Sequence, residues 1–412
     1  MGSAVPERPP AGQSSPWAVF LVSLRLGLTS FGGPVAHIGY FREEFVTRRQ
    51  WLSERSYADL VALCQFLPGP ASSQVGMALG LSRCGHAGAL AAWAGFTLPS
   101  AVLLMSLAMG LSSFGQALPP GVLQGLKVVA VAVVAQAVWG MARTLCTDVP
   151  RISLMTAAAC WVLLAPTAWA QLGAIALGAA VGLWLFKPAA SDSADALPIA
   201  VSRRTGAAWL TVFAALLVGL PLAASLWPSP ALAMVDAFFR AGSLVFGGGH
   251  VVLPLLQTEV VANGWVTHDT FLAGYGATQA VPGPLFTFAA FLGASMNQGP
   301  TGWAGGLLCL VAVFVPSFLL VAGALPFWAQ WRRHARMQAA LAGINAVVVG
   351  LLLAALYQPV WTGAVHSPQD VALALVALVA LMHWKLPPWL VVAGCAVLGG
   401  LLGALTGRTL AP

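Results

Sequence analysis

Apolar runs long enough to cross a lipid bilayer recur along this chain, separated by short polar breaks. A hydrocarbon core of about 30 Å needs about 20 apolar residues in helical form, so these runs predict membrane-spanning helices. The clear candidates are residues 87–111, 121–145, 152–168, 172–186, 207–226, 303–325, 337–357, 371–382 and 389–405. Composition agrees, since 59% of the residues are hydrophobic and 8% are charged. The pattern predicts an all-α polytopic membrane protein.

Two less regular regions, residues 17–81 and 231–296, carry the same motifs in the same order. The first motif comprises Arg25, Gly27, Phe31, Gly32 and Gly33, and it recurs as Arg240, Gly242, Phe246, Gly247 and Gly248. The second comprises Gln65, Pro68, Gly69 and Pro70, and it recurs as Gln279, Pro282, Gly283 and Pro284. Further matches in the same order are Glu44 with Glu259, Trp51 with Trp265, Ser100 with Ser317, Gly125 with Gly343, and Lys127 with Asn345. The chain is therefore predicted to be a duplication.

The Pro68–Gly69–Pro70 tripeptide is expected to break a helix near mid-membrane. Residues 57–66 and 71–81 on either side are each about 15 Å long as helix, which is half a hydrocarbon core. Proline lacks a backbone donor and glycine admits unusual dihedrals, so the break frees polar backbone groups that must face protein or water. The alternative is a proline kink used only for packing. Each motif region is accordingly either two discontinuous spans or two re-entrant hairpins.

Basic residues decide the orientation, because cytoplasmic loops are enriched in Lys and Arg. A cytoplasmic N-terminus places ten of them in or beside cytoplasmic connections: Arg83, Arg143, Arg151, Lys187, Arg203, Arg204, Arg332, Arg333, Arg336 and Lys385. Re-entrant hairpins also return Arg42, Arg48, Arg49 and Arg55 to that side, so the charges favour hairpins. An odd number of crossings between the motif regions inverts the second copy and places the C-terminus in the periplasm.

These arguments divide the chain into six parts. We expect an N-terminal cytoplasmic tail (1–15), a first membrane repeat (16–186), a cytoplasmic linker (187–206), a connecting transmembrane helix (207–227), a second, inverted repeat (228–406) and a C-terminal tail (407–412). Two inverted-topology repeats with broken or re-entrant helices are typical of secondary transporters, whose substrate site lies near the bilayer midplane.

Arg25 and Arg240 stand within apolar helices, about two turns before a glycine pair. An ion at membrane depth is costly unless it is paired or hydrated, so it marks a candidate functional site. Snorkelling to the interface is the simpler alternative for each arginine alone. Two guanidiniums facing one another across a pseudo-twofold axis would repel, and a shared dianion would relieve that repulsion through bidentate hydrogen bonds. The expected substrate is anionic.

Glycines and polar side chains near the motifs offer further donors to an anion. Bare backbone N–H groups at a helix start can approach an oxyanion closely, although glycine pairs also serve helix packing. For the polar side chains, hydrogen bonding between helices is an equal alternative. The full set of substrate-site candidates is Arg25, Ser30, Gly32, Gly33, Gln65, Pro68, Gly69, Pro70, Gln74, Lys127, Arg240, Ser243, Gly247, Gly248, Gly249, His250, Gln279, Pro282, Gly283, Pro284 and Asn345.

The motif segments resemble those of the chromate ion transporter family in its long, two-domain form. The resemblance runs from about residue 17 to 405 and is carried by residues 31–34, 66–70, 246–250 and 279–284. It implies a bacterial inner-membrane carrier that exports chromate by the proton motive force, confers chromate resistance and confuses chromate with sulfate. Sulfate or another tetrahedral oxyanion, or a passive anion channel, stays open. Glu44 and Glu259 are the first candidates to carry the coupled proton, ahead of Asp59 and Asp236.

Several classes of function find no support in the sequence. No glycine-rich phosphate loop ending in Gly-Lys-Ser or Gly-Lys-Thr occurs, and no convincing catalytic constellation suggests an enzyme. The six cysteines and seven histidines show no metal-ligand spacing, so we expect neither a metal nor a cofactor. The net charge of +7 is dispersed between apolar segments, which argues against nucleic acid. The expected partners are chromate, protons and lipid, and a homodimer is one option for the assembly.

Overall fold

The computed structural model describes residues 15–114, 119–186, 201–246, 249–331 and 334–406, and over these ranges every regular element is a helix. The prediction of an all-α membrane protein is confirmed. Six described helices are long and apolar enough to cross a membrane. The expected spans at 152–168, 172–186 and 371–382 correspond to apolar helices that are shorter than these six. They are α6 (Val149–Leu164), α7 (Ala168–Leu185) and α17 (Pro368–Met382).

The first motif region folds into short helices that meet at glycine- and proline-containing breaks. Helix α1 (Pro16–Thr29) is followed by α2 (Gly33–Arg42), which continues as the π-helix η1 (Glu43–Arg48), and then by α3 (Glu54–Phe66) and α4 (Ala71–Phe114). The helix breaks between Phe66 and Ala71, as the tripeptide predicts. Helix α4 leaves helical geometry at Cys84 and Gly85, where the chain reverses, so that Gly80 and Gly88 pack face to face.

The second motif region repeats this order of elements. It comprises α9 (Pro230–Leu244), η3 (Gly249–Val251) leading into α10 (Val252–Val260), α11 (His268–Thr278), η4 (Leu285–Thr287) leading into α12 (Phe288–Ala294), and α13 (Gly302–Ala324). Gly293 packs closely on Gly305, as Gly80 packs on Gly88 in the first half. Gly247 and Gly248, two of the predicted site residues, lie outside the described ranges. The short η5 (Leu325–Phe327) and α14 (Trp328–Trp331) follow α13.

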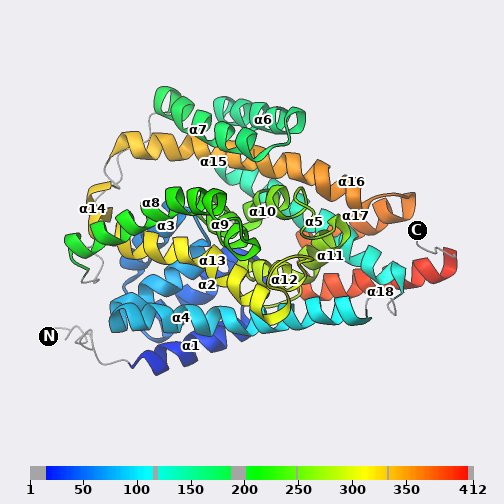
Figure 1. Cartoon of the computed structure of the whole chain (residues 1–412), viewed down its shortest axis with the longest axis horizontal. Helices are drawn as coiled ribbons and strands as arrows, with labels where there is room; N and C mark the ends of the chain where they lie inside the picture. Colours follow the sequence, from blue (N-terminus) through cyan, green and yellow to red (C-terminus); the bar gives the residue numbers. More distant parts are fainter. Residues whose placement is uncertain (1–14, 115–118, 187–200, 247–248, 332–333, 407–412) are drawn as a thin grey trace, which may run out of the picture.

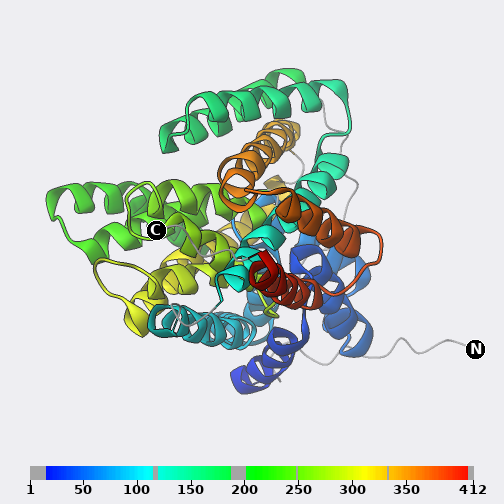
Figure 2. The same cartoon turned by 90° about the vertical axis from the view of Figure 1, so that its right-hand side faces the viewer.

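The two halves exchange their long helices. Helix α5 (Pro120–Leu145) of the first half packs against α17 and α18 (Pro388–Thr406) of the second. Helix α15 (Ala335–Ala355), extended by η6 (Leu356–Trp361) and α16 (Thr362–Ala364), packs against α6 and α7 of the first half, which cover its outer side (Figures 1 and 2). The repeat-related glycines Gly125 and Gly343 make these contacts, on Cys395 and Gly178 respectively. Each half is therefore completed by the other.

Valine in place of Gly125 should destabilise the protein, because a side chain there meets the backbone carbonyl of Cys395, which cannot move aside. Overpacking of this kind costs about 2 kcal/mol. Gly140, on the same helix, has open space around its Cβ position and supplies a matched control. We expect thermal unfolding in detergent to show a lower Tm for Gly125→Val than for Gly140→Val; equal values would contradict the packing argument.

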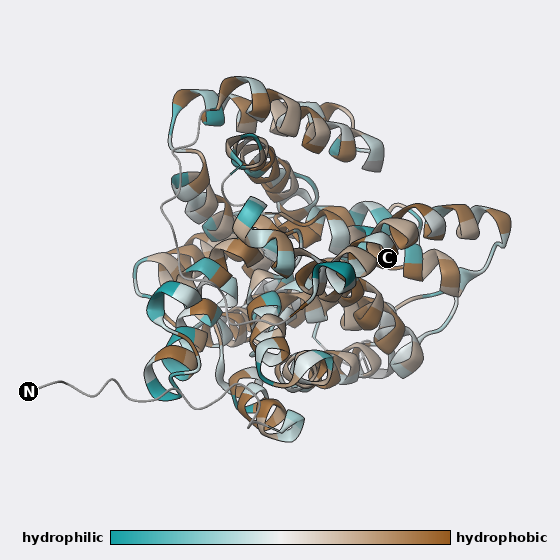
Figure 3. Ribbon diagram, turned by 90° about the vertical axis from the view of Figure 1, so that its left-hand side faces the viewer, coloured by the Kyte–Doolittle hydropathy of each residue, from teal (hydrophilic) through white to brown (hydrophobic). Residues whose placement is uncertain are grey.

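The outer helices present apolar side chains to the surroundings. Leu164, Trp169 and Trp184 on α6 and α7 are 86%, 82% and 82% exposed, and Figure 3 shows that hydrophobic residues are frequent in the peripheral helices. Helix α8 (Arg203–Leu226) rests against α9 and α13 and buries only Gly206. Exposed apolar surface on this scale is suited to lipid contact. The protein is a multi-pass membrane protein.

Arginine-bearing loops gather at one end of the bundle, which we call the basic end. The guanidinium groups of Arg49 and Arg83 both lie over the ring of Trp51, at 5.8 and 5.0 Å from its centroid. Trp209, near the start of α8, donates a hydrogen bond to the neighbouring His86. The loop after η1, the reversal of α4 and the start of α8 are thus at the same end.

Candidate functional site

A central cavity of about 620 Å³ lies where the broken regions of both halves meet. The first half contributes the segments around Gly32 and Gly69, and the second those around Gly249 and Gly283. Nine of the predicted site residues line it: Gly32, Gly33, Gln65, Gly69, Gly249, His250, Gln279, Gly283 and Asn345. Residues far apart in sequence, and from both repeats, therefore form one site.

Two reciprocal hydrogen bonds join the halves beside the central cavity. The N–H of Gly69 donates to the carbonyl of Val245 at 2.7 Å, and the N–H of Gly283 donates to the carbonyl of Ser30 at 2.9 Å. Gly69 is the repeat counterpart of Gly283, and Ser30 precedes Phe31 as Val245 precedes Phe246. Both glycines have positive φ, 121° and 100°, which other residues rarely adopt. The breaks therefore serve a specific contact between the repeats.

Serines from the opposite half lie directly beside these glycines. A Cβ atom on Gly283 would lie 2.8 Å from the hydroxyl of Ser100, and one on Gly69 would contact the hydroxyl of Ser317. Ser100 and Ser317 are themselves repeat counterparts. Any side chain at either glycine would have to displace its serine, so the absence of a Cβ atom allows the close approach of the two halves.

Four helices begin at the cavity wall. Gly33 starts α2, Ala71 starts α4, Gly249 starts the η3–α10 segment, and Leu285 starts the η4–α12 segment; all four residues line the cavity. The first N–H groups of a helix have no partner within it, and the helix dipole places partial positive charge there. Four such ends converging on one space make it attractive to an anion.

Polar side chains add hydrogen-bonding groups to this backbone frame. The Nε2 of Gln279 and the Oδ1 of Asn345 are buried and have no hydrogen-bond partner in the described part of the chain. Buried polar atoms of this kind are normally satisfied by a partner, water or ligand. Gln65 and His250 line the same space, and His250 Nδ1 shares a hydrogen bond of 2.7 Å with the Tyr275 hydroxyl.

One wall of the cavity was not foreseen from the sequence. Helix α5 lines it from Val133 to Leu145, with Gln136 and Thr144 as polar groups, and its side chains pass from buried near Val133 to exposed at Thr144. The signal available was the presence of polar residues within an apolar predicted span. Nothing in the repeat pointed to them, because the counterpart of Gln136 in the second half is an alanine.

The mouth of the central cavity faces the basic end. Gly206, at the start of α8, packs on Pro326, and α15 begins a few residues later. Near its start, α15 packs through Ala339 on the last part of α7, and Arg151 at the start of α6 lies over Phe186 just beyond α7. Helix α5 ends immediately before α6, so its last turns also lie at the basic end. These turns line the cavity and are partly exposed, which places the opening of the cavity at that end.

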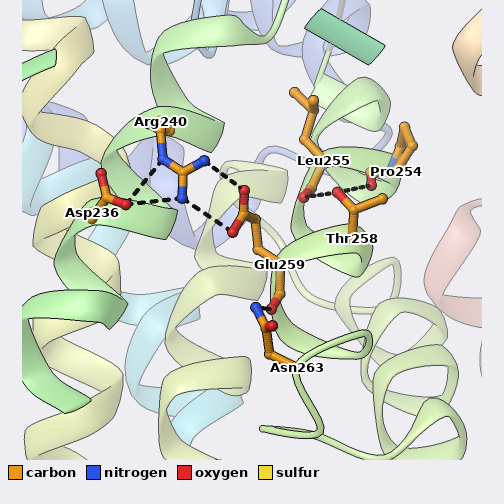
Figure 4. Close-up of polar contacts among 7 residues, drawn as sticks. All are labelled: Asp236, Arg240, Pro254, Leu255, Thr258, Glu259 and Asn263. Atoms are coloured by element: carbon orange, nitrogen blue, oxygen red, sulfur yellow. Dashed lines mark hydrogen bonds and ion pairs between the residues drawn. The ribbon is translucent and has the colours of Figure 1, made fainter. Parts of the chain in front are cut away.

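Arg240 occupies a different place from the one expected. Its guanidinium bridges two carboxylates, 2.9 Å from Asp236 Oδ2 and 3.0 Å from Glu259 Oε1 (Figure 4). It borders a separate crevice of about 20 Å³ and not the central cavity. Buried charges require partners, and the acids of its own half supply them.

Arg25, the repeat counterpart, is exposed on α1 and also lies outside the cavity lining. It interacts electrostatically with Glu44, whose carboxylate pairs with Arg48 at 3.1 Å and Arg49 at 2.7 Å. The two arginines predicted to share one dianion thus belong to two separate Arg–Glu clusters.

The remaining predicted residues stand behind the lining. Gln74 donates to the carbonyl of Pro68 at 2.7 Å, and Ser243 donates to that of Phe239 at 2.7 Å. Lys127, the repeat counterpart of Asn345, pairs with Asp269 at 3.0 Å and lies outside the cavity lining. The others outside the lining are Ser30, Pro68, Pro70, Pro282 and Pro284.

Interrupted helices that meet at a central cavity are typical of multi-pass membrane transporters. Residues 17–183 and 232–400 match the sequence profile of the chromate transporter family, one stretch in each half. The chain belongs to that family.

Curated relatives agree with this assignment. The chain is 30% identical to the chromate transport protein of Pseudomonas aeruginosa over 369 residues, covering 85% of this chain and 82% of the relative. It is 27% identical to a probable chromate transport protein of Synechococcus elongatus, covering 91% and 93% of the two chains. The uncharacterized transporter YwrA of Bacillus subtilis is 29% identical over 40% of this chain and 93% of its own length. No solved structure matches the chain.

Proposed function

We propose that this protein is a secondary transporter that exports chromate across the bacterial inner membrane, driven by the proton motive force, and so confers chromate resistance. The observation that carries the proposal is the convergence of four helix N-termini on one cavity in the core of a chromate transporter family member. A tetrahedral dianion needs several donors and positive potential, and helix starts supply both without a fixed cation.

The proposed binding site follows the cavity lining. Backbone N–H groups at Gly33, Ala71, Gly249 and Leu285 face the anion, and the side chains of Gln65, Gln279, Asn345 and His250 complete its shell. Donors of this kind recognise charge and shape rather than the central atom, so sulfate is expected to compete. Arg240 joins Asp236 and Glu259, and Arg25 lies near Glu44, so neither arginine is assigned to the anion.

An inverted arrangement of the repeats is supported by the position of two equivalent tryptophans. Trp51 lies at the basic end, beside Arg83. Its counterpart Trp265 accepts a hydrogen bond from the N–H of Asn297, just before the start of α13. Helix α13 reaches the basic end with its other terminus, so Trp265 belongs to the opposite end. With the basic end in the cytoplasm, the cavity is open inward.

Membrane potential favours this direction of transport. Moving one charge across 100 mV is worth about 2.3 kcal/mol, so a dianion leaving a negative cytoplasm gains about 5 kcal/mol per 100 mV. For the proton we propose Glu44 and Glu259 as carriers. The Glu259 cluster has two carboxylates for one guanidinium, and a proton there would neutralise the excess negative charge.

Uptake of radiolabelled chromate into everted membrane vesicles tests the proposal. Respiring vesicles that contain the protein should accumulate chromate above the level of vesicles without it, and an uncoupler should abolish the accumulation. Excess sulfate should reduce it. Chromate that only equilibrates would indicate a passive channel, and sulfate accumulation without chromate uptake would indicate another oxyanion as substrate.

A further inference from the structure

We infer that binding of the dianion in the central cavity takes up a proton on His250, with Tyr275 as the partner that accommodates both charge states of the imidazole. The inference rests on the proposed function and adds a protonatable group within the anion site itself. This group is distinct from the acids at Glu44 and Glu259, which lie in ion pairs away from the cavity lining.

The imidazole of His250 is held between a buried partner and the cavity. Its Nδ1 is 2.7 Å from the hydroxyl of Tyr275, a side chain that is fully buried against Phe288. Its Nε2 is directed toward the first turn of α2 in the other half, where a Cβ atom on Gly33 would lie 3.9 Å away. An anion at the start of α2 would therefore meet the Nε2 edge of the ring.

Tyr275 can serve the imidazole in either charge state. A tyrosine hydroxyl donates to Nδ1 of a neutral histidine and accepts from Nδ1–H of an imidazolium. In both cases Nε2 carries a hydrogen that points to the cavity and can donate to an oxyanion. The histidine can thus gain or lose a proton without breaking its buried hydrogen bond, and histidine is the side chain that titrates near neutral pH.

Few other charged groups near the cavity could compensate the negative charge of the dianion. Among the described lining residues there is no Lys, Arg, Asp or Glu, and Cys64 on α3 is the other titratable group. Of the elements packed around His250, α2 carries His37, which is buried near Ser72, and α15 presents the neutral Asn345. Apart from partial charges at helix ends, a positive charge beside the anion must come from a proton on His250.

The proton is taken from solvent as the dianion binds, and it resides on His250 while the anion is bound. The net charge of the occupied site falls from two negative charges to one.

Calorimetric titration of the purified protein with chromate, at each of several pH values in two buffers of different ionisation enthalpy, measures this proton. The wild type should take up close to one proton more per chromate bound than His250→Gln, and its affinity should weaken up to tenfold per pH unit as the pH rises. Chromate's own ionisation contributes equally to both proteins and cancels in the comparison. His86→Gln, which removes a histidine beside Trp209 and outside the cavity, should behave as wild type.

The outcomes separate the two proposals. Chromate binding with equal proton uptake in wild type and His250→Gln would overturn the role of His250 and leave the anion site intact. Absence of chromate binding to the wild type at any pH would overturn the proposed function and this inference with it. If His250→Gln does not fold, the wild type alone decides, because no proton uptake beyond chromate's own ionisation would refute the inference. Tyr275→Phe should retain chromate binding but lower the proton uptake.

Discussion

Leucine in place of Gly33 should reduce chromate accumulation in everted vesicles at least tenfold. Gly33 lines the central cavity at the start of α2 and has a positive φ of 78°. A leucine side chain would project toward His250 Nε2, the nearest atom to its Cβ position, and would fill the space beside the α2 N-terminus. The anion would lose access to the helix end and to the histidine together.

Gly39 provides the matched control for this prediction, because it lies on the same helix, is exposed and has open space around its Cβ position. Gly39→Leu should transport normally. Both variants are to be compared at equal abundance in the membrane, since the positive φ of Gly33 adds backbone strain of about 1 kcal/mol. Normal flux through Gly33→Leu would remove the α2 N-terminus from the anion site.

Glutamine in place of Arg240 should destabilise the protein by about 3 kcal/mol. The substitution leaves the carboxylates of Asp236 and Glu259 side by side without the guanidinium that joins them (Figure 4). Their side chains are 9% and 14% exposed, so water compensates little. Removing one member of a buried ion pair costs this much because an uncompensated charge stays behind. Thermal unfolding in detergent measures the loss.

Two further variants test the cause of this destabilisation. Neutralising the acids in the same background, as Arg240→Gln with Asp236→Asn and Glu259→Gln, should restore most of the stability. Arg25→Gln alters the exposed counterpart and should cost less than about 1 kcal/mol. An Arg240→Gln protein as stable as wild type, or a triple variant as unstable as Arg240→Gln, would show that the ion cluster is not what stabilises this region.

Helix positions were largely predictable because they depend on local properties. Each of the nine expected spans coincides with a helix, and the break before Ala71 follows from the dihedral limits of proline and glycine. The bounds of these helices show the limit of this reasoning. Hydropathy marks an apolar segment, but the residue at which its helix begins depends on local capping, as at Asp148 and Ser367, the N-caps of α6 and α17.

The candidate site was predictable only in part. The repeated motifs led directly to Gly33, Gly69, Gly249 and Gly283, which line the cavity. They also led to Arg25 and Arg240, because an intramembrane charge in a repeat suggests a substrate contact. Glu44 and Glu259 approach them from other helices, and that neutralisation is apparent only once the chain is folded.

The sequence by itself determined that this is a duplicated, all-α membrane protein whose helices break at matching glycines and prolines, since hydrophobic length and backbone dihedrals are properties of short segments. Only the tertiary structure decided how the two halves join. The backbone N–H of Gly69 donates a hydrogen bond to Val245, and that of Gly283 donates one to Ser30. It also decided that α5 forms a cavity wall and that the arginines stand apart from it. These features depend on packing between residues far apart in the chain, which no local pattern encodes.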